Sequence, residues 1–181
     1  MENRQFLIFG GRMIMEYQDI YDAFGQKTGR KILRGENLSD GEYIYGVHVY
    51  IKNTDGTWLI QQRAYSLRTN PGQWEFTSGM LLSGENSISA AKRETYEEIG
   101  IFLKDEQLQF VRTFKRKKNF VDIWFAKVDI PIEEYVLDEC EVAAVKYIAK
   151  DELIVLINKL PYREIEYKEM VIFSLRNDEE Q

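Results

Sequence analysis

The run GMLLSGENSISAAKRETYEEIGI, from Gly79 to Ile101, constrains the fold of this chain more than any other feature. Helical periodicity covers positions 85–99, so these residues are predicted to form one helix. At about 100° per residue, Glu97 falls roughly 60° to one side of Glu94, and Glu98 falls roughly 40° to the other side. Three carboxylates are therefore expected to share one face of this helix.

An apolar stripe lies next to the acidic face. Ile88, Ala91, Thr95 and Ile99 project roughly 60° to 140° from Glu94, which suits packing against a sheet. The three carboxylates repel one another by a few tenths of a kcal/mol per pair in water, so a cation among them would be stabilising. Hard divalent cations prefer oxygen ligands, and Mg²⁺ binds through a few carboxylates together with substrate phosphates.

The spacing of these residues resembles the Nudix box. Eight defined positions match in register: Gly79, Glu85, Arg93, Glu94, Glu97, Glu98, Gly100 and the apolar Ile101. Thr95 departs from the aliphatic residue that is usual there, and its hydroxyl needs a partner if it is buried. The resemblance implies an α/β (α+β) fold, namely a Nudix-like α/β/α sandwich with a mixed β-sheet and a central catalytic helix.

The resemblance also implies a metal site built on the helix. Glu94, Glu97 and Glu98 would be the catalytic metal ligands, assisted by a backbone carbonyl at Ser78 or Gly79. The expected cofactor is Mg²⁺, with Mn²⁺ as the alternative ion.

Three other box residues are expected to be structural. Glu85 and Arg93 would form a salt bridge that ties the loop to the helix, because arginine presents a rigid fork to a carboxylate. The third is Gly100. Like Gly79, it would permit a backbone conformation or a close approach that a Cβ would obstruct.

Metal ions that bridge phosphoanhydride oxygens neutralise the charge that repels a nucleophile and generate hydroxide near neutral pH. The expected function is therefore Mg²⁺-dependent hydrolysis of a diphosphate linkage in a small molecule, a nucleoside diphosphate linked to another moiety. The general base stays open between a box glutamate, Glu97 or Glu98, and a later acid, Glu139 or Glu141. Arg63 and Arg68 precede the box, where the family often places cations that meet substrate phosphates.

Two other functions remain as alternatives. The segments GEYIYGVHVYIKN and PGQWEF resemble the branch of isopentenyl-diphosphate isomerase, but isomerisation needs a proton donor and acceptor, and those enzymes use a cysteine near the site. Cys140 is the only cysteine and lies far along the chain. A non-catalytic nucleotide-binding Nudix domain is the other alternative, although every charged box position is intact. His48, on a predicted strand, either faces a cleft or is a hydrogen-bonded structural residue.

The rest of the chain shows no internal repeat, and 181 residues with 44% hydrophobic composition fit one domain, 1–181. An N-terminal β-hairpin extension is expected at about 12–36, and strands are expected around the TDGT turn at 54–57. A hairpin with the basic tip KRKK at 115–118 and a strand at 142–149 would follow. Helices are expected at about 150–177.

The charge balance limits the partners. Lys plus Arg is 24 and Asp plus Glu is 30, giving a net charge of −6, which argues against nucleic acid and anionic membranes. A single cysteine and the lack of any membrane-spanning apolar run indicate a cytoplasmic protein. We expect a small-molecule diphosphate substrate and a homodimer, because an N-terminal hairpin can pair or swap between copies.

Overall fold

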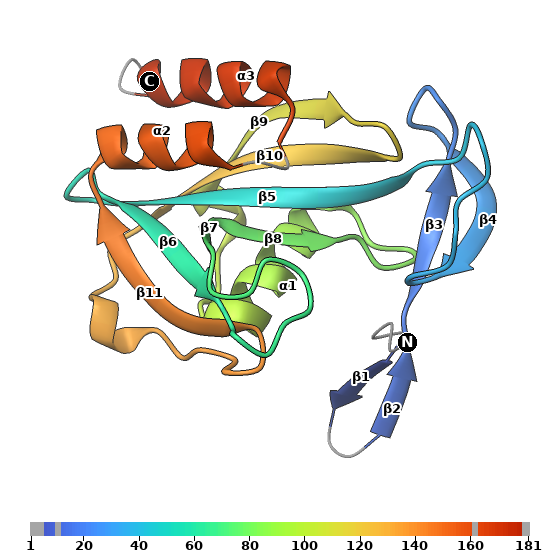
Figure 1. Ribbon diagram of the computed structural model, residues 1–181, viewed down its shortest axis with the longest axis horizontal. Helices are drawn as coiled ribbons and strands as arrows, with labels where there is room; N and C mark the ends of the chain where they lie inside the picture. The colour runs from blue at the N-terminus through green and yellow to red at the C-terminus, as the bar shows by residue number, and fades with distance from the viewer. Residues whose placement is uncertain (1–5, 10–11, 161–162, 179–181) are drawn as a thin grey trace.

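A seven-stranded mixed sheet organises the fold (Figure 1). The computed structural model describes residues 6–9, 12–160 and 163–178. The strands are β1 (Phe6–Phe9), β2 (Arg12–Met15), β3 (Tyr17–Tyr21), β4 (Lys27–Leu33), β5 (Ile44–Asn53), β6 (Trp58–Arg63), β7 (Trp74–Glu75), β8 (Thr77–Met80), β9 (Leu108–Lys115), β10 (Asn119–Val128) and β11 (Val142–Ile148). The helices are α1 (Ser87–Ile99), α2 (Lys150–Lys159) and α3 (Ile165–Arg176), with 3-10 turns at Asp105–Gln107 and Ile132–Glu134.

The strand order of the main sheet is β11-β6-β5-β10-β9, with β7 paired to β6 and β8 paired to β5. The central strands β5 and β10 run parallel along their whole lengths, and the other pairs in this sheet are antiparallel. The mixed sheet predicted from the sequence is therefore confirmed. β8, which begins the box, lies directly beside the buried strand β5.

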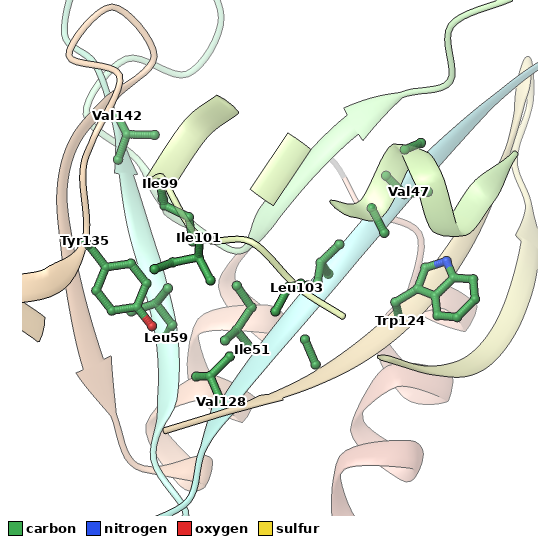
Figure 2. Packing of buried hydrophobic residues seen from close by; sticks show 14 of the residues in the cluster. Val47, Ile51, Leu59, Ile99, Ile101, Leu103, Trp124, Val128, Tyr135 and Val142 are labelled. Carbon is green, nitrogen blue, oxygen red and sulfur yellow. The ribbon is translucent and has the colours of Figure 1, made fainter. Parts of the chain in front are cut away.

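The two faces of the sheet carry two separate cores because side chains alternate along a strand. On β5, Val47, Val49 and Ile51 belong to a cluster that includes Ala91 and Ile99 of α1, and Figure 2 shows several members of this cluster. The intervening residue Tyr50 belongs to a second cluster, formed with residues of α2 and α3. One face is thus covered by α1 and the other by α2 and α3.

These layers form the α/β/α sandwich that the sequence predicted (Figure 1). The turn between β5 and β6 contains the TDGT sequence, and the Asn53 amide there donates to the Thr57 carbonyl over 2.8 Å. α2 and α3 lie within the segment predicted to be helical, and the KRKK tip joins β9 to β10. Within the described residues, no helix is both long enough and apolar enough to cross a membrane.

The hairpin of β3 and β4 lies outside the main sheet and is docked against the loop that leads into α1. The Ser83 amide donates to the Tyr17 carbonyl over 2.7 Å. Asp19 accepts hydrogen bonds from the Ser83 hydroxyl at 2.8 Å and from the Gly84 amide at 3.0 Å. This hairpin occupies part of the predicted N-terminal extension, and its contacts fix it next to the box.

Candidate functional site

Local sequence sets both ends of α1. The Asn86 side chain accepts from the Ser89 amide over 2.9 Å, so the helix begins at Ser87 instead of the predicted Glu85. Gly100 ends it in the left-handed conformation, with φ of 75°. A Cβ at Gly100 would also come within 2.8 Å of the Val136 carbonyl oxygen, which supports the structural role expected for this glycine.

Arg93 uses all five of its N–H donors. Its Nε and Nη2 donate to the two oxygens of Glu85 at 2.9 and 3.0 Å, which is the bidentate pair expected from the sequence. Its Nη1 donates to Glu94 at 2.9 Å and to Glu97 at 2.8 Å. A second Nη2 hydrogen bond, of 2.9 Å, goes to the Met80 carbonyl. Arg93 therefore ties the loop, β8 and the helix together and keeps no donor for a ligand.

Gly79 provides the space in which the Glu94 carboxyl lies. A Cβ on Gly79 would be 1.8 Å from Cδ of Glu94, closer than any side chain can come. Glu94 is 9% exposed, and burial raises the pKa of its carboxyl to about 7, although the Arg93 guanidinium acts in the opposite direction. Gly79 and its neighbour Ser78 both lie on β8, opposite Val47 and His48.

Glu98 lies deeper than Glu94 and is 6% exposed. Its Oε2 accepts a hydrogen bond of 2.8 Å from the Gln61 amide, whose own oxygen accepts from the Thr77 hydroxyl at 3.0 Å. Burial, followed by the nearby charge of Glu94, holds the pKa of Glu98 well above its ordinary value. The neutral side-chain amide of Gln61 thus donates a hydrogen bond to the buried Glu98 carboxylate.

Glu94, Glu97 and Glu98 all line the same pocket, on the helix face predicted from the sequence, but they differ in exposure. Glu97 is exposed and turned to Arg93, whereas Glu94 and Glu98 are buried. In the described part of the chain, no three His, Cys, Asp or Glu side chains gather closely enough to hold a metal ion. The physical reason is that Arg93 draws Glu94 and Glu97 towards its guanidinium, while Gln61 holds Glu98.

Thr95 fits the buried stripe of α1. It is fully buried together with Ala91 and Ile99. Its hydroxyl donates to the Ala91 carbonyl over 2.7 Å, so the polar group has the partner that burial requires. The departure from the usual aliphatic residue therefore leaves no unsatisfied group.

The carboxylates border a pocket of about 1200 Å³ between α1, the N-terminal hairpin and the segment that follows Val136. Glu141 lines this pocket, and Glu139 is not among the described residues that do. The described lining residues are Met15, Glu16, Tyr17, Lys31, Arg34, Leu82, Ser83, Arg93, Glu94, Tyr96, Glu97, Glu98, Gly100, Phe102, Val136, Leu137, Asp138 and Glu141. Sequence reasoning missed the hairpin residues, because no local pattern shows that this hairpin folds against the box.

The guanidinium of Arg63 is hydrogen-bonded to its own loop and to a neighbouring strand. The guanidinium of Arg63 donates to the Thr69 carbonyl at 2.9 Å and to Glu75 at 2.7 Å. Neither Arg63 nor Arg68 is among the described residues that line the pocket. The geometry gives Arg63 a role in fixing its own loop and does not support a phosphate contact.

His48 lies on the face of the sheet opposite α1. Its Nδ1 is 2.6 Å from the Tyr167 hydroxyl, which in turn lies 2.8 Å from the Tyr50 hydroxyl. Burial, with a further contribution from nearby arginines, lowers the pKa of His48 well below its ordinary value. His48 is therefore a neutral, hydrogen-bonded core residue, which is the structural alternative that the sequence left open.

The family follows from the fold, the box and a direct comparison. The Nudix domain family model matches residues 42–171, so the chain belongs to the Nudix family. An uncharacterised Nudix hydrolase of Listeria monocytogenes is 34% identical over 140 residues, which are 77% of this chain and 83% of that protein. The chain is thus a Nudix-type pyrophosphohydrolase.

Two more distant similarities concern the fold and the isomerase alternative. A Deinococcus radiodurans protein, DR0079, superposes with a TM-score of 0.68 at 18% identity, covering 86% of this chain and 97% of that one. The isopentenyl-diphosphate Delta-isomerase of Corynebacterium diphtheriae is 33% identical over 81 residues, which are 44% of each chain. The first similarity supports the fold, and the second covers less than half of the chain.

Proposed function

We propose that this chain is a Mg²⁺-dependent hydrolase that cleaves the diphosphate linkage of a small molecule, a nucleoside diphosphate joined to another moiety. The observation that carries the proposal is the pair of buried carboxylates, Glu94 and Glu98, at the wall of a pocket that is large enough for a nucleotide derivative. Buried carboxylates are costly unless a cation compensates them, and a hard metal ion would compensate them.

The oxygen ligands that the site offers fit Mg²⁺, with Mn²⁺ as the alternative ion. Glu94 and Glu98 supply carboxylate oxygens, and the cradle at Gly79 brings the Glu94 carboxyl against the β8 backbone, where a carbonyl of Ser78 or Gly79 is a further oxygen donor. Glu97, an exposed carboxylate that lines the same pocket, would complete the set. When bound, the metal supplies charge neutralisation at the phosphate oxygens and activation of a water molecule.

We assign the general base to Glu141 in preference to Glu139. Glu141 lines the pocket, and its charge contributes to the raised pKa of Glu98, so it lies within electrostatic reach of the buried pair. A carboxylate oxygen of Glu141 would accept the proton of the attacking water. The two box candidates, Glu97 and Glu98, are assigned to the metal site in this proposal.

A nucleoside is favoured by an aromatic pair on the pocket wall. The rings of Tyr96 and Phe102 are stacked with centroids 4.0 Å apart and an interplanar angle of 27°. Both side chains are exposed, Phe102 to 76%, although large aromatic side chains are usually buried. A flat exposed ring next to the phosphate-cleaving centre is suited to stacking a base.

The isomerase alternative rests on a similarity that covers less than half of the chain. Cys140 is exposed and is not among the described residues of the pocket, so it is not placed to exchange a proton with a bound alkene.

The test is a panel of diphosphate compounds incubated with the protein and Mg²⁺. We expect release of phosphate or a nucleotide, loss of this release on chelation, and a fall of at least about two decades in kcat for Glu98→Gln. The exposed Glu133→Gln should retain the wild-type rate and serves as the matched control. Equal rates for wild type and Glu98→Gln would remove the proposed role of Glu98.

A further inference from the structure

The pocket contains an unexplained cationic wall. Among the described residues that line it, the cations are Lys31, Arg34 and Arg93. Arg93 is saturated by Glu85, Glu94, Glu97 and the Met80 carbonyl. Among the cations of the described lining, the two of the N-terminal hairpin segment, Lys31 and Arg34, therefore have donors for an anionic ligand.

Arg34 follows β4 directly and is held in place from one side. Its amide donates to the Glu16 carbonyl over 2.8 Å, and its Nη1 donates to Oε2 of Glu16 over 2.5 Å. The Glu16 side chain is 4% exposed, whereas that of Arg34 is 45% exposed. Within the described residues, the guanidinium of Arg34 has Glu16 as its recorded hydrogen-bond partner, which leaves other edges of the planar fork accessible.

The negative charge of the lining favours a fixed cation that would attract an anionic substrate. Among the described residues, five glutamates line the pocket: Glu16, Glu94, Glu97, Glu98 and Glu141. The field of Glu94 and Glu141 reaches Arg34, since both charges, after Glu16, raise the pKa of its guanidinium against the effect of burial. A diphosphate that enters this pocket would meet repulsion from the carboxylates unless fixed cations also face it.

Arginine is well matched to this task because its fork forms two parallel hydrogen bonds to phosphate oxygens. The hairpin is also fixed relative to the box, since Asp19 is hydrogen-bonded to Ser83 and Gly84 of the box loop. A phosphate contact from Arg34 would therefore be held at a set position relative to Glu94 and Glu98.

We propose that Arg34, assisted by Lys31, binds a phosphate group of the substrate, so that the N-terminal hairpin supplies the phosphate-binding side of the site. Glu16 acts as the positioning residue that holds the Arg34 guanidinium. The inference rests on the proposed function in that it names the binding residues for the same diphosphate.

The test uses the intact chain and inorganic pyrophosphate with Mg²⁺ as the probe. Calorimetry on Arg34→Ala should show at least a tenfold weaker Kd than the wild type, and Lys31→Ala a smaller loss. Arg30→Ala is the matched control, because Arg30 lies on β4, the strand that Arg34 follows, pairs with Glu42 and is not among the described lining residues. Its Kd should equal that of the wild type.

Arg34→Lys covers the case in which Arg34→Ala fails to fold, because lysine keeps a charge next to Glu16 but lacks the fork. It should bind pyrophosphate several-fold more weakly with an unchanged melting temperature. For any compound that the wild type hydrolyses, KM should rise by the same factor as Kd while kcat stays within about twofold.

The two proposals fail in different ways. Pyrophosphate binding that depends on Arg34 in a protein that hydrolyses nothing would support the inference and contradict the hydrolase. Hydrolysis with equal KM in wild type and Arg34→Lys would overturn the inference and leave the hydrolase standing. Lack of pyrophosphate binding by the wild type would also overturn the inference.

Discussion

The side-chain amide of Gln61 donates a hydrogen bond of 2.8 Å to Oε2 of Glu98, and both residues are buried. Gln61 comes from β6, whereas Glu98 comes from α1. The Thr77 hydroxyl fixes the Gln61 oxygen and so sets which end of the amide meets Glu98. A strand outside the box therefore orients one of the box carboxylates.

Gln61→Leu should lower kcat/KM about 10- to 100-fold, because the Glu98 carboxylate loses the partner that orients it. The measurement is the Mg²⁺ concentration that gives half-maximal rate, which should rise. Gln62→Leu is the control, since Gln62 is bonded to the Tyr65 hydroxyl and the Gly72 carbonyl and not to the box. Equal effects of both substitutions would contradict the role of Gln61.

Gly79→Ala should abolish most of the activity. The new Cβ would lie 1.8 Å from Cδ of Glu94, so the carboxyl must move out of its cradle. A fall of two decades or more in kcat is expected, with a folded protein by circular dichroism. Gly56→Ala is the control: it has φ of 88° and open space, so it should cost about 1 kcal/mol in stability and leave kcat unchanged.

Arg93→Lys should lower both stability and activity. Lysine replaces five fixed donors by three on a flexible stem, so Glu85 loses its bidentate partner and Glu94 loses an anchor. We expect a loss of about 2 kcal/mol in the free energy of unfolding, measured with denaturant. The neighbouring Lys92→Ala breaks an exposed pair with Asp105 and should change it by less than about 0.5 kcal/mol. Equal losses would contradict this account of Arg93.

The box was predictable from sequence because its contacts are local. Glu85 and Arg93 are only 8 residues apart along the chain. The geometry of a helix places Ala91, Thr95 and Ile99 on one side, where they form one buried stripe. The sheet was predictable for a similar reason, since turn residues such as those of TDGT mark the ends of adjacent strands.

The pocket was not predictable, because it depends on contacts between distant segments. Arg34 reaches the site only because the hairpin docks on Ser83 and Gly84, about fifty residues further along the chain. Helical angles placed Glu97 and Glu98 on a common face, and both line the pocket, but these angles could not show that Glu98 is buried while Glu97 pairs with Arg93. Arg63 was assigned from its closeness in sequence, but Glu75 and Thr69 hold its guanidinium.

The contribution of Asp19 to the free energy of unfolding should depend on pH. Burial acts to raise the pKa of this carboxyl, but hydrogen bonds from Lys27, Gly84 and Ser83 outweigh it and lower the pKa from 3.8 to about 2. A lowered folded-state pKa stabilises the protein above the unfolded value, and that stabilisation is lost as pH falls from about 4 through about 2. Compared with Asp19→Asn, the wild type should be more stable by about 1 kcal/mol at pH 6, after allowing for solvent screening. Urea unfolding of both proteins from pH 6 to pH 2 measures the difference in their free energies of unfolding. This difference should shrink as the pH falls. A difference that stays constant would show that Asp19 does not act through its charge.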